Sequence, residues 1–370
     1  MLQTKVKDIQ SQNCTNRMNN DVKVNAVYVV KNEWPLLAVS ISHALTNYAD
    51  KVIIIDTGSE DGIFEGIRLL ETLWEGRVQL FRCRQEIYDQ IPLTNLLIEM
   101  SKENDADWTM ILDADEFLVH NNYPELLAKL SQTDEKWSSY AIKVVNFIVD
   151  EKHDDSDLES FAKISYRINS QGVSQSPDDE YTRRVTLGEI PLQYRSTPDK
   201  LLVRNSQDIF ISQGSHQVVF GDGIWWEKHD SSVASAGFLG GMICHLPYTS
   251  ENRLIARKKR LFFDRQKTTF RLSTDQLSDA SPSALRKMAV LNPKNRDQWL
   301  QAGVITTDNA FEESLKPVID KLQKFWPQLT LATFKSEVAD SFPDSLDLKI
   351  VSKLIRKYHS RAETMWDGQR

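Results

Sequence analysis

Four short apolar runs, each followed at once by polar residues, constrain the fold of this 370-residue chain more than any other feature. The runs are VNAVYVV (24–30), KVIIID (51–56), RVQLFRC (77–83) and WTMIL (108–112). Near-continuous apolar runs are typical of strands buried on both faces of a parallel sheet. Helical patterns lie between them: one opens at Pro35, one covers 62–74 with Asp61 as its expected N-cap, and one covers 92–103. Alternating strands and helices predict an α/β fold with right-handed crossovers.

Acidic and amide side chains follow the carboxyl ends of three of these predicted strands. They are Asn32, Glu33, Asp56, Asp113 and Asp115. Parallel strands place their carboxyl ends along one edge, where open α/β sheets bind ligands, so we expect these side chains to converge. Carboxylate oxygens are suitable ligands for a hard divalent cation, Mg²⁺ or Mn²⁺. Taken singly, the same residues also fit acidic turns that face water or cap a helix.

The loop after Asp56 excludes two familiar nucleotide sites. Its sequence, TGSEDG (57–62), is neither G-x-G-x-x-G nor a P-loop with a lysine after glycine. A dinucleotide cofactor and a Walker-type phosphate site are therefore not indicated. An acidic residue at this strand end is instead suited to accept hydrogen bonds from a base N–H or from ribose hydroxyls.

Four motifs together resemble a known enzyme family. They are Lys31-Asn32-Glu33, the segment Asp56 to Gly62, the D-A-D-E-F segment 113–117, and His245-Leu246-Pro247. Their order and spacing resemble the family 2-like glycosyltransferases of the GT-A fold, in the branch with D-x-D-E-F and a later H-x-P element. The resemblance covers residues 24–120 well and 198–262 more loosely. It implies a GT-A-type, Rossmann-like sheet with flanking helices and a mainly helical C-terminal region.

The same resemblance implies a metal-dependent enzyme of glycan or polysaccharide synthesis. The enzyme would move a sugar from a nucleotide-sugar donor, with a UDP-sugar the first choice, to a hydroxyl of a glycan or lipid-linked acceptor, with inversion. Asn32, Glu33 and Asp56 would contact the nucleotide or ribose. Asp113 would lie at the ribose and the metal, and Asp115 and His245 would hold Mn²⁺ or Mg²⁺. His216 resembles a second family histidine at the donor site.

Three further residues are candidates on chemical grounds. Lys200 and Arg204, in PDKLLVRN, could clamp a diphosphate, or could form a solvated strand face. Inversion requires a carboxylate that deprotonates the acceptor hydroxyl. Asp222, in FGDGIWWEKHD, is the candidate base, because glycines surround it and two tryptophans that could stack on a sugar follow. A turn aspartate above two core tryptophans is the alternative.

Composition and charge indicate a cytoplasmic enzyme with a distinct C-terminal part. The chain has 41% hydrophobic and 26% charged residues and three scattered cysteines, which suit a reducing compartment. Residues 1–250 carry a net charge of −14 and residues 251–370 carry +7. We expect a flexible leader (1–21), a glycosyltransferase domain (22–250) with an insertion at 150–181, and a basic helical region (251–370).

Within the C-terminal region, 264–300 is expected to be a linker, and helices are expected over 308–335 and 344–364. The basic cluster 257–260 could bring the enzyme to the inner face of a membrane, or could simply be a solvated helix face. No nucleic-acid partner is expected.

Two other functions remain open from the sequence. A sugar nucleotidyltransferase would share the α/β sheet and the acidic metal site, but it usually has a glycine-rich phosphate loop after the first strand, which residues 27–40 lack. A catalytically silent protein could use the same fold to bind a glycan or a partner. It would not need Asp113, Asp115 and His245, so the presence of all three argues against this alternative.

Overall fold

The computed structural model describes residues 22–83, 90–133, 137–169, 178–205, 209–211, 218–220, 241–250, 253 and 280–331. The expected leader, His216, Asp222, the basic cluster 257–260 and the expected helix 344–364 lie outside the described residues.

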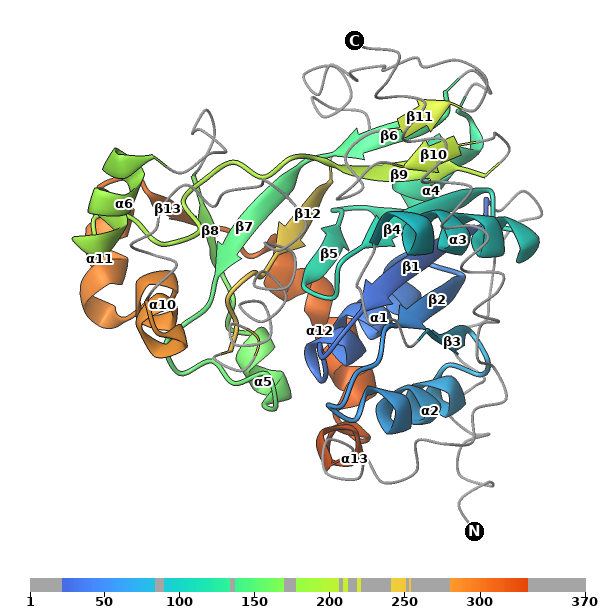
Figure 1. The fold of residues 1–370 in the computed structure, drawn as a ribbon, viewed down its shortest axis with the longest axis horizontal. Helices are drawn as coiled ribbons and strands as arrows, with labels where there is room; N and C mark the ends of the chain where they lie inside the picture. Colours follow the sequence, from blue (N-terminus) through green and yellow to red (C-terminus); the bar gives the residue numbers. More distant parts are fainter. Residues whose placement is uncertain are drawn as a thin grey trace.

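A six-stranded sheet forms the centre of the molecule, and its strand order is β3-β2-β1-β4-β9-β6 (Figure 1). Its strands are β3 (Val78–Arg82), β2 (Lys51–Asp56), β1 (Val24–Val30), β4 (Trp108–Leu112), β9 (Lys200–Arg204) and β6 (Ser139–Ile142). The first four are parallel, whereas β9 is antiparallel to both β4 and β6. The predicted parallel α/β sheet is thereby confirmed, and the order 3-2-1-4 is that of a Rossmann-like half.

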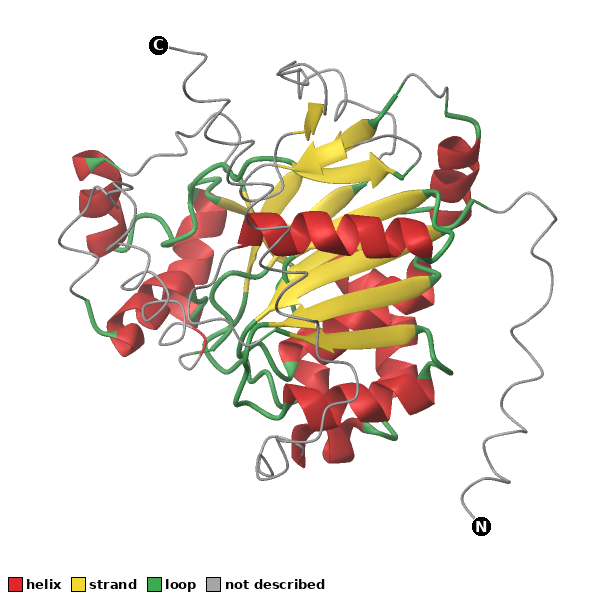
Figure 2. Ribbon diagram, turned by 45° about the vertical axis from the view of Figure 1, so that its right-hand side comes forward, coloured by secondary structure: helices red, strands yellow, loops and turns green. Residues whose placement is uncertain are grey.

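Helices cover both faces of this sheet because successive strand residues point to opposite sides. Val27, Val29, Ile53 and Ile55 pack with α3 (Gln90–Glu103) on one face. Their neighbours in β1 and β2 pack on the other face with α1 (Leu36–Asn47) and α2 (Ile63–Leu73). Figure 2 shows this layered arrangement, with a helix across the near face of the sheet and further helices behind it. These layers leave the carboxyl ends of the strands as the edge at which a site can form.

A second, five-stranded sheet continues from the first and has the order β13-β8-β7-β12-β5. Its strands are β13 (Ile305–Thr307), β8 (Tyr166–Ile168), β7 (Val144–Ile148), β12 (Met242–His245) and β5 (Glu116–Val119). Strand β12 runs antiparallel to β5, with His245 paired to Glu116, and parallel to β7. This register carries His245 to the segment that follows β4. A separate pair joins β10 (Ile209–Ile211) to β11 (Val218–Phe220).

The C-terminal helices pack against the sheets. Helix α12 (Ala310–Leu322) contacts α1 and β5, and Phe311 lies against both Phe117 of β5 and Phe147 of β7. Helix α13 (Trp326–Leu331) contacts α2, and the Trp34 indole N–H donates to the Leu329 carbonyl at 2.9 Å. A third cluster surrounds β8 and β13 and includes side chains from three of the remaining helices, with Val185, Leu285 and Trp299 among them. The described helices not yet given are α4 (Tyr123–Ser131), α5 (Leu158–Phe161), α6 (Asp179–Thr186), α10 (Pro282–Ala289) and α11 (Pro293–Gln301).

Three local predictions need correction. The N-cap of α2 is Gly62, with φ +82°, and Asp61 lies one residue earlier, where its Oδ2 accepts from the Trp34 N–H at 2.7 Å. The expected linker 264–300 contains α10 and α11 in its second half. The expected insertion 150–181 contributes α5 and β8, and β8 pairs with β7 and β13. These short polar elements were missed because their apolar contacts come from distant parts of the chain.

Candidate active site

The loops after β1 and β2 are joined at the carboxyl edge of the main sheet. The Asn32 N–H donates to Ser59 Oγ at 2.8 Å, and the Glu60 N–H donates to Asn32 Oδ1 at 2.8 Å. Asn32 has φ +56°, a left-handed conformation that asparagine tolerates better than most residues. The expected convergence of these two strand ends is therefore present in the structure.

Asp56 is buried at the end of β2, and both of its carboxylate oxygens have partners. Oδ1 accepts from the Ser59 N–H at 2.9 Å, and Oδ2 lies 3.2 Å from Arg82 Nε at the end of β3. Arg82 also donates to the Ser59 carbonyl at 3.0 Å. Asp56 thus shapes the loop that follows β2, as one of the two readings of the sequence anticipated. Arg82, which the sequence did not single out, adds a cation beside it.

A tight turn between β4 and β5 presents the two aspartates. The Glu116 N–H donates to the Asp113 carbonyl at 3.0 Å, and the Asp113 N–H donates to Glu116 Oε2 at 2.9 Å. Ser40 of α1 donates to the Glu116 carbonyl at 3.0 Å, and this hydrogen bond ties the turn to α1. Within this turn Asp115 is 1% exposed, whereas the Asp113 side chain is 42% exposed. Asp113 is therefore the aspartate that a ligand can reach directly.

Lys200, the first residue of β9, is the counterion of this turn. Its Nζ lies 2.9 Å from Asp113 Oδ2 and 3.0 Å from Glu116 Oε2. Burial favours a lower pKa of Lys200, but the two carboxylates outweigh it and raise the pKa, so the ammonium stays charged. Burial also raises the pKa of Glu116. For Asp113 the same burial effect is outweighed by Lys200, and its pKa lies below the usual value.

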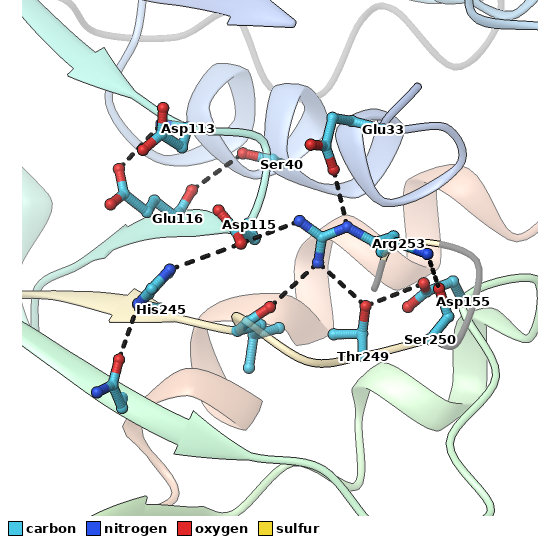
Figure 3. A network of polar contacts seen from close by, with 12 residues as sticks. Glu33, Ser40, Asp113, Asp115, Glu116, Asp155, His245, Thr249, Ser250 and Arg253 are labelled. Carbon is cyan, nitrogen blue, oxygen red and sulfur yellow. Dashed lines mark hydrogen bonds and ion pairs between the residues drawn. The ribbon is translucent and has the colours of Figure 1, made fainter. Parts of the chain in front are cut away.

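Asp115 lies at the centre of a second buried polar network (Figure 3). Its Oδ2 is 2.9 Å from Arg253 Nη2 and 3.5 Å from His245 Nε2. Arg253 Nε donates in turn to Glu33 Oε2 at 2.8 Å. The Leu246 N–H donates to the Asp115 carbonyl at 2.8 Å, which ties the end of β12 to the turn. Glu33, Asp115 and His245, predicted from three distant motifs, therefore meet in one place.

A further layer holds Arg253. Its Nη1 donates to the Leu246 carbonyl and to Thr249 Oγ1, both at 3.1 Å. Thr249 donates to Asp155 Oδ2 at 3.0 Å, and His153 Nε2 lies 3.1 Å from Asp155 Oδ1. No motif in the sequence indicates Arg253 or Asp155. Arg253 precedes a long basic run, and Asp155 lies in a segment that we interpreted as a polar insertion.

Of the remaining sequence candidates, one lies away from the site and two lie outside the described residues. Arg204 lies at the far end of β9, beside Trp108 at the start of β4, and donates to the carbonyls of Trp137 and Thr133. Its guanidinium also stacks on the Trp108 ring, at 4.5 Å from the centroid. The structure therefore does not bring Arg204 to the site. His216 and Asp222 lie outside the described residues.

The side chains around Asp115 are suited to a divalent cation whose coordination shell is completed by phosphates and water. Within the described ranges, no group of three or more His, Cys, Asp or Glu side chains is gathered closely enough to enclose a metal. Asp115 and His245 instead form a pair, since the Asp113 carboxylate is directed to Lys200. Hard cations such as Mg²⁺ often bind only one or two protein carboxylates and take their other ligands from phosphates and water. The donor set fits that pattern, and the imidazole adds a ligand that Mn²⁺ accepts.

The chain is similar to one protein family and to several solved structures. The model of glycosyl transferase family 2 matches residues 26–184. Similar solved structures include S. aureus TarS 1–349, at 10% identity and a TM-score of 0.33, with 84% of this chain and 87% of that chain covered. GalNAc-T7 with UDP, GalNAc and Mn²⁺ is similar at 11% identity and a TM-score of 0.34, with 84% and 59% covered.

GlyE of Streptococcus pneumoniae TIGR4, in its apo form, is similar at 16% identity and a TM-score of 0.22, with 33% of this chain and 29% of that chain covered. No curated protein matches the sequence. In the described part of the chain, no helix is both long and apolar enough to cross a membrane. The family match spans β1 to α6 and includes the turn that carries Asp113 and Asp115. Residues 26–184 therefore resemble the domain that the glycosyl transferase family 2 model describes.

Proposed function

We propose that the protein is a metal-dependent glycosyltransferase that moves a sugar from a nucleotide-sugar donor to an acceptor hydroxyl, with inversion. A UDP-sugar is the proposed donor, and a glycan or a lipid-linked sugar is the proposed acceptor. One observation carries the proposal: Asp115 and His245 lie 3.5 Å apart at the carboxyl edge of the sheet, next to the exposed carboxylate of Asp113. The family 2 match, which covers the turn that carries Asp113 and Asp115, supports this proposal.

In this proposal Asp115 and His245 hold the cation. A divalent ion bound there would stabilise the negative charge that develops on the departing nucleoside diphosphate. Arg253 orients Asp115 through the contact at 2.9 Å and supplies a counter-charge to its buried carboxylate. Glu33, on the other side of the guanidinium, prevents Arg253 from moving onto the ligand as a free cation.

Asp113 and Lys200 have a different role. The exposed carboxylate of Asp113 accepts hydrogen bonds from hydroxyls of the ribose or the donor sugar, and Lys200 keeps it deprotonated. Lys200 is 2% exposed and already engaged with two carboxylates, so it acts through Asp113 and is not a direct clamp on the diphosphate. Asp222 remains the proposed base.

The first test is a thermal-shift panel of UDP, GDP, CDP and dTDP, each with and without Mn²⁺. A ligand at about 100 times its Kd adds about 2.7 kcal/mol to the free energy of unfolding, which is readily measured. We expect one diphosphate to raise Tm only with metal, and Asp115→Asn to abolish that rise. Asp297→Asn is the matched control, because this exposed aspartate of α11 lies outside the site and pairs with its neighbour Arg296. Its ligand response should equal that of the wild type.

The second test identifies the reaction. Release of the nucleoside diphosphate from the matching nucleotide-sugar should depend on Mn²⁺ and on an added acceptor. Release of pyrophosphate from a nucleoside triphosphate and a sugar 1-phosphate would show a nucleotidyltransferase instead. Binding of glycans without metal, together with no diphosphate response in folded protein, would favour a silent binding protein.

A further inference from the structure

We propose that Asn146 is a positioning residue that keeps a hydrogen on Nδ1 of His245 and thereby leaves Nε2 as the ring nitrogen that binds a divalent cation. The inference rests on the proposed metal-dependent function and adds a residue to it that no motif indicates. Asn146 lies in β7, beside β12, and its Cα is paired with that of His245.

The orientation of the Asn146 amide is set by two backbone carbonyls. Its Nδ2 donates to the Gln193 carbonyl at 3.0 Å and to the Arg195 carbonyl at 3.2 Å. The reverse orientation would place the amide oxygen against two groups that can only accept. Asn146 is 3% exposed, so water does not offer an alternative partner. The carbonyl of Gln193 is fixed as well, since the Gln193 side chain donates to the Ala289 carbonyl of α10 at 2.8 Å.

With the amide fixed, its oxygen decides where the imidazole hydrogen lies. Asn146 Oδ1 is 2.8 Å from His245 Nδ1. An amide oxygen cannot donate, so the hydrogen in this contact belongs to Nδ1. A neutral imidazole has one N–H group, and its other nitrogen therefore carries a lone pair. Thr197 Oγ1 makes a longer contact of 3.4 Å with the same amide oxygen and does not compete with the imidazole.

The lone pair of Nε2 then faces a carboxylate. Nε2 lies 3.5 Å from Asp115 Oδ2, and a lone pair opposite a carboxylate oxygen is repulsive unless a cation is shared. Two ligands that each bind one cation at ~2.1 Å, with an angle of ~90–110° between them, are separated by ~3.0–3.4 Å. The observed spacing is close to that value. A histidine whose second ring nitrogen is held by a protein acceptor is also the usual arrangement at metal centres.

The first experiment measures which ring nitrogen carries the hydrogen in protein saturated with Mg²⁺, a diamagnetic cation. Long-range ¹H–¹⁵N spectra of histidine-labelled protein at pH 7.5 distinguish a protonated from a bare ring nitrogen, and His245→Gln identifies the signals. We expect His245 to be protonated on Nδ1 and bare on Nε2. A hydrogen on Nε2, or none on Nδ1, would overturn the inference, because Nε2 would then not be the nitrogen that binds the cation. This readout requires no variant at position 146.

The second experiment measures affinity for Mn²⁺ alone, by electron paramagnetic resonance of the free ion. Asn146→Leu keeps the shape of the side chain and removes its hydrogen bonds, and we expect it to weaken Mn²⁺ binding about 10- to 100-fold. Thr197→Val is the matched control and should bind as the wild type does. Equal affinity for folded Asn146→Leu and wild type would refute the positioning role.

Neither experiment uses a sugar donor, which separates this inference from the proposed reaction. The expected tautomer and affinities, found together with no sugar transfer, would leave the inference standing and remove the proposed function. Metal-dependent sugar transfer by a protein whose Mn²⁺ affinity does not change with the residue at position 146 would support the proposed function and refute the inference. Wild-type protein that binds no Mn²⁺ would overturn the inference by itself.

Discussion

Replacing Lys200 with methionine removes the one cation that contacts Glu116 in the described structure, and we expect a large loss of stability. Glu116 and Lys200 are each 2% exposed, and their charged atoms are 3.0 Å apart. At an effective dielectric constant of about 20 this pair contributes about 5 kcal/mol of attraction, which partly offsets the cost of burying both charges. The contact with Asp113 adds less, because that side chain is 42% exposed and screened by water.

Loss of one partner leaves the other as a buried unpaired charge, which typically costs about 3–5 kcal/mol. Methionine fills most of the volume of the lysine stem, so the change is chiefly electrostatic. We therefore expect Lys200→Met to lower the free energy of unfolding by about 3–5 kcal/mol at pH 7.5, measured by urea denaturation. The deficit should shrink at pH 5, because burial raises the pKa of Glu116 and protonation removes the unpaired charge.

The double variant Lys200→Met/Glu116→Gln provides the decisive control. Glutamine keeps an oxygen that can accept from the Asp113 N–H, as Glu116 Oε2 does at 2.9 Å, but it carries no charge. We expect it to recover most of the lost stability. A single variant that loses less than about 1 kcal/mol, or a double variant no better than the single one, would refute the argument from buried unpaired charge.

Three further predictions concern residues away from the metal pair. Burial lowers the pKa of His43 to about 3, so the unfolded chain takes up a proton that the folded chain does not, and stability should fall as the pH drops from about 6.5 towards 3. His43→Gln should flatten that fall by up to about 1.4 kcal/mol per pH unit in urea denaturations at pH 6.5, 5.5 and 4.5; equal slopes would contradict it. Burial raises the pKa of Asp61 to about 6, so between about pH 4 and pH 6 the unfolded chain releases a proton that the folded chain keeps, and the folded state loses stability as the pH rises through that range. Asp61→Asn should raise the free energy of unfolding by up to about 3 kcal/mol at pH 7.5 and by little at pH 4, and a gain independent of pH would count against this cause. Gly66→Ala places a Cβ 2.0 Å from Trp34 Cζ2, and the displaced ring should lower the free energy of unfolding by about 1–3 kcal/mol; an unchanged denaturation midpoint would show that the ring moves freely.

The parallel half of the fold could be predicted from the sequence because its signals are local. Strands β1, β2 and β4 are apolar runs buried on both faces, whereas β3 is a partly buried edge strand. The polar residues that follow β1, β2 and β4 mark the end of the sheet at which the ligand site lies. The antiparallel strands give no such signal. Lys200 and Arg204 are both basic residues of β9, but they are four positions apart, or ~13 Å along a strand. Only the antiparallel pairing with β4 decides that Lys200, and not Arg204, lies at the active edge.

The polar network around Asp115 shows a second limit. His245 could be found because it belongs to a motif, whereas Asn146, Asp155 and Arg253 are ordinary polar residues in their local sequences. Their positions follow from the pairing of β12 with β5 and β7, which joins segments about a hundred residues apart. A single sequence does not reveal which distant strands pair. The residues that orient a site are therefore harder to predict than the residues that form it.

The contact of Phe311 with both Phe117 and Phe147 has a consequence for how the protein can be divided. The segment matched by the family, 26–184, ends before β9, β12 and α12. Cut out alone, it would expose the edge of β4, the apolar flank of β5 and the two phenylalanine rings on which α12 rests. We expect such a fragment to aggregate, since an uncovered strand edge beside apolar surface is a template for association. The segment matched by the family model is therefore shorter than the segment that we expect to fold independently, which extends at least to α12.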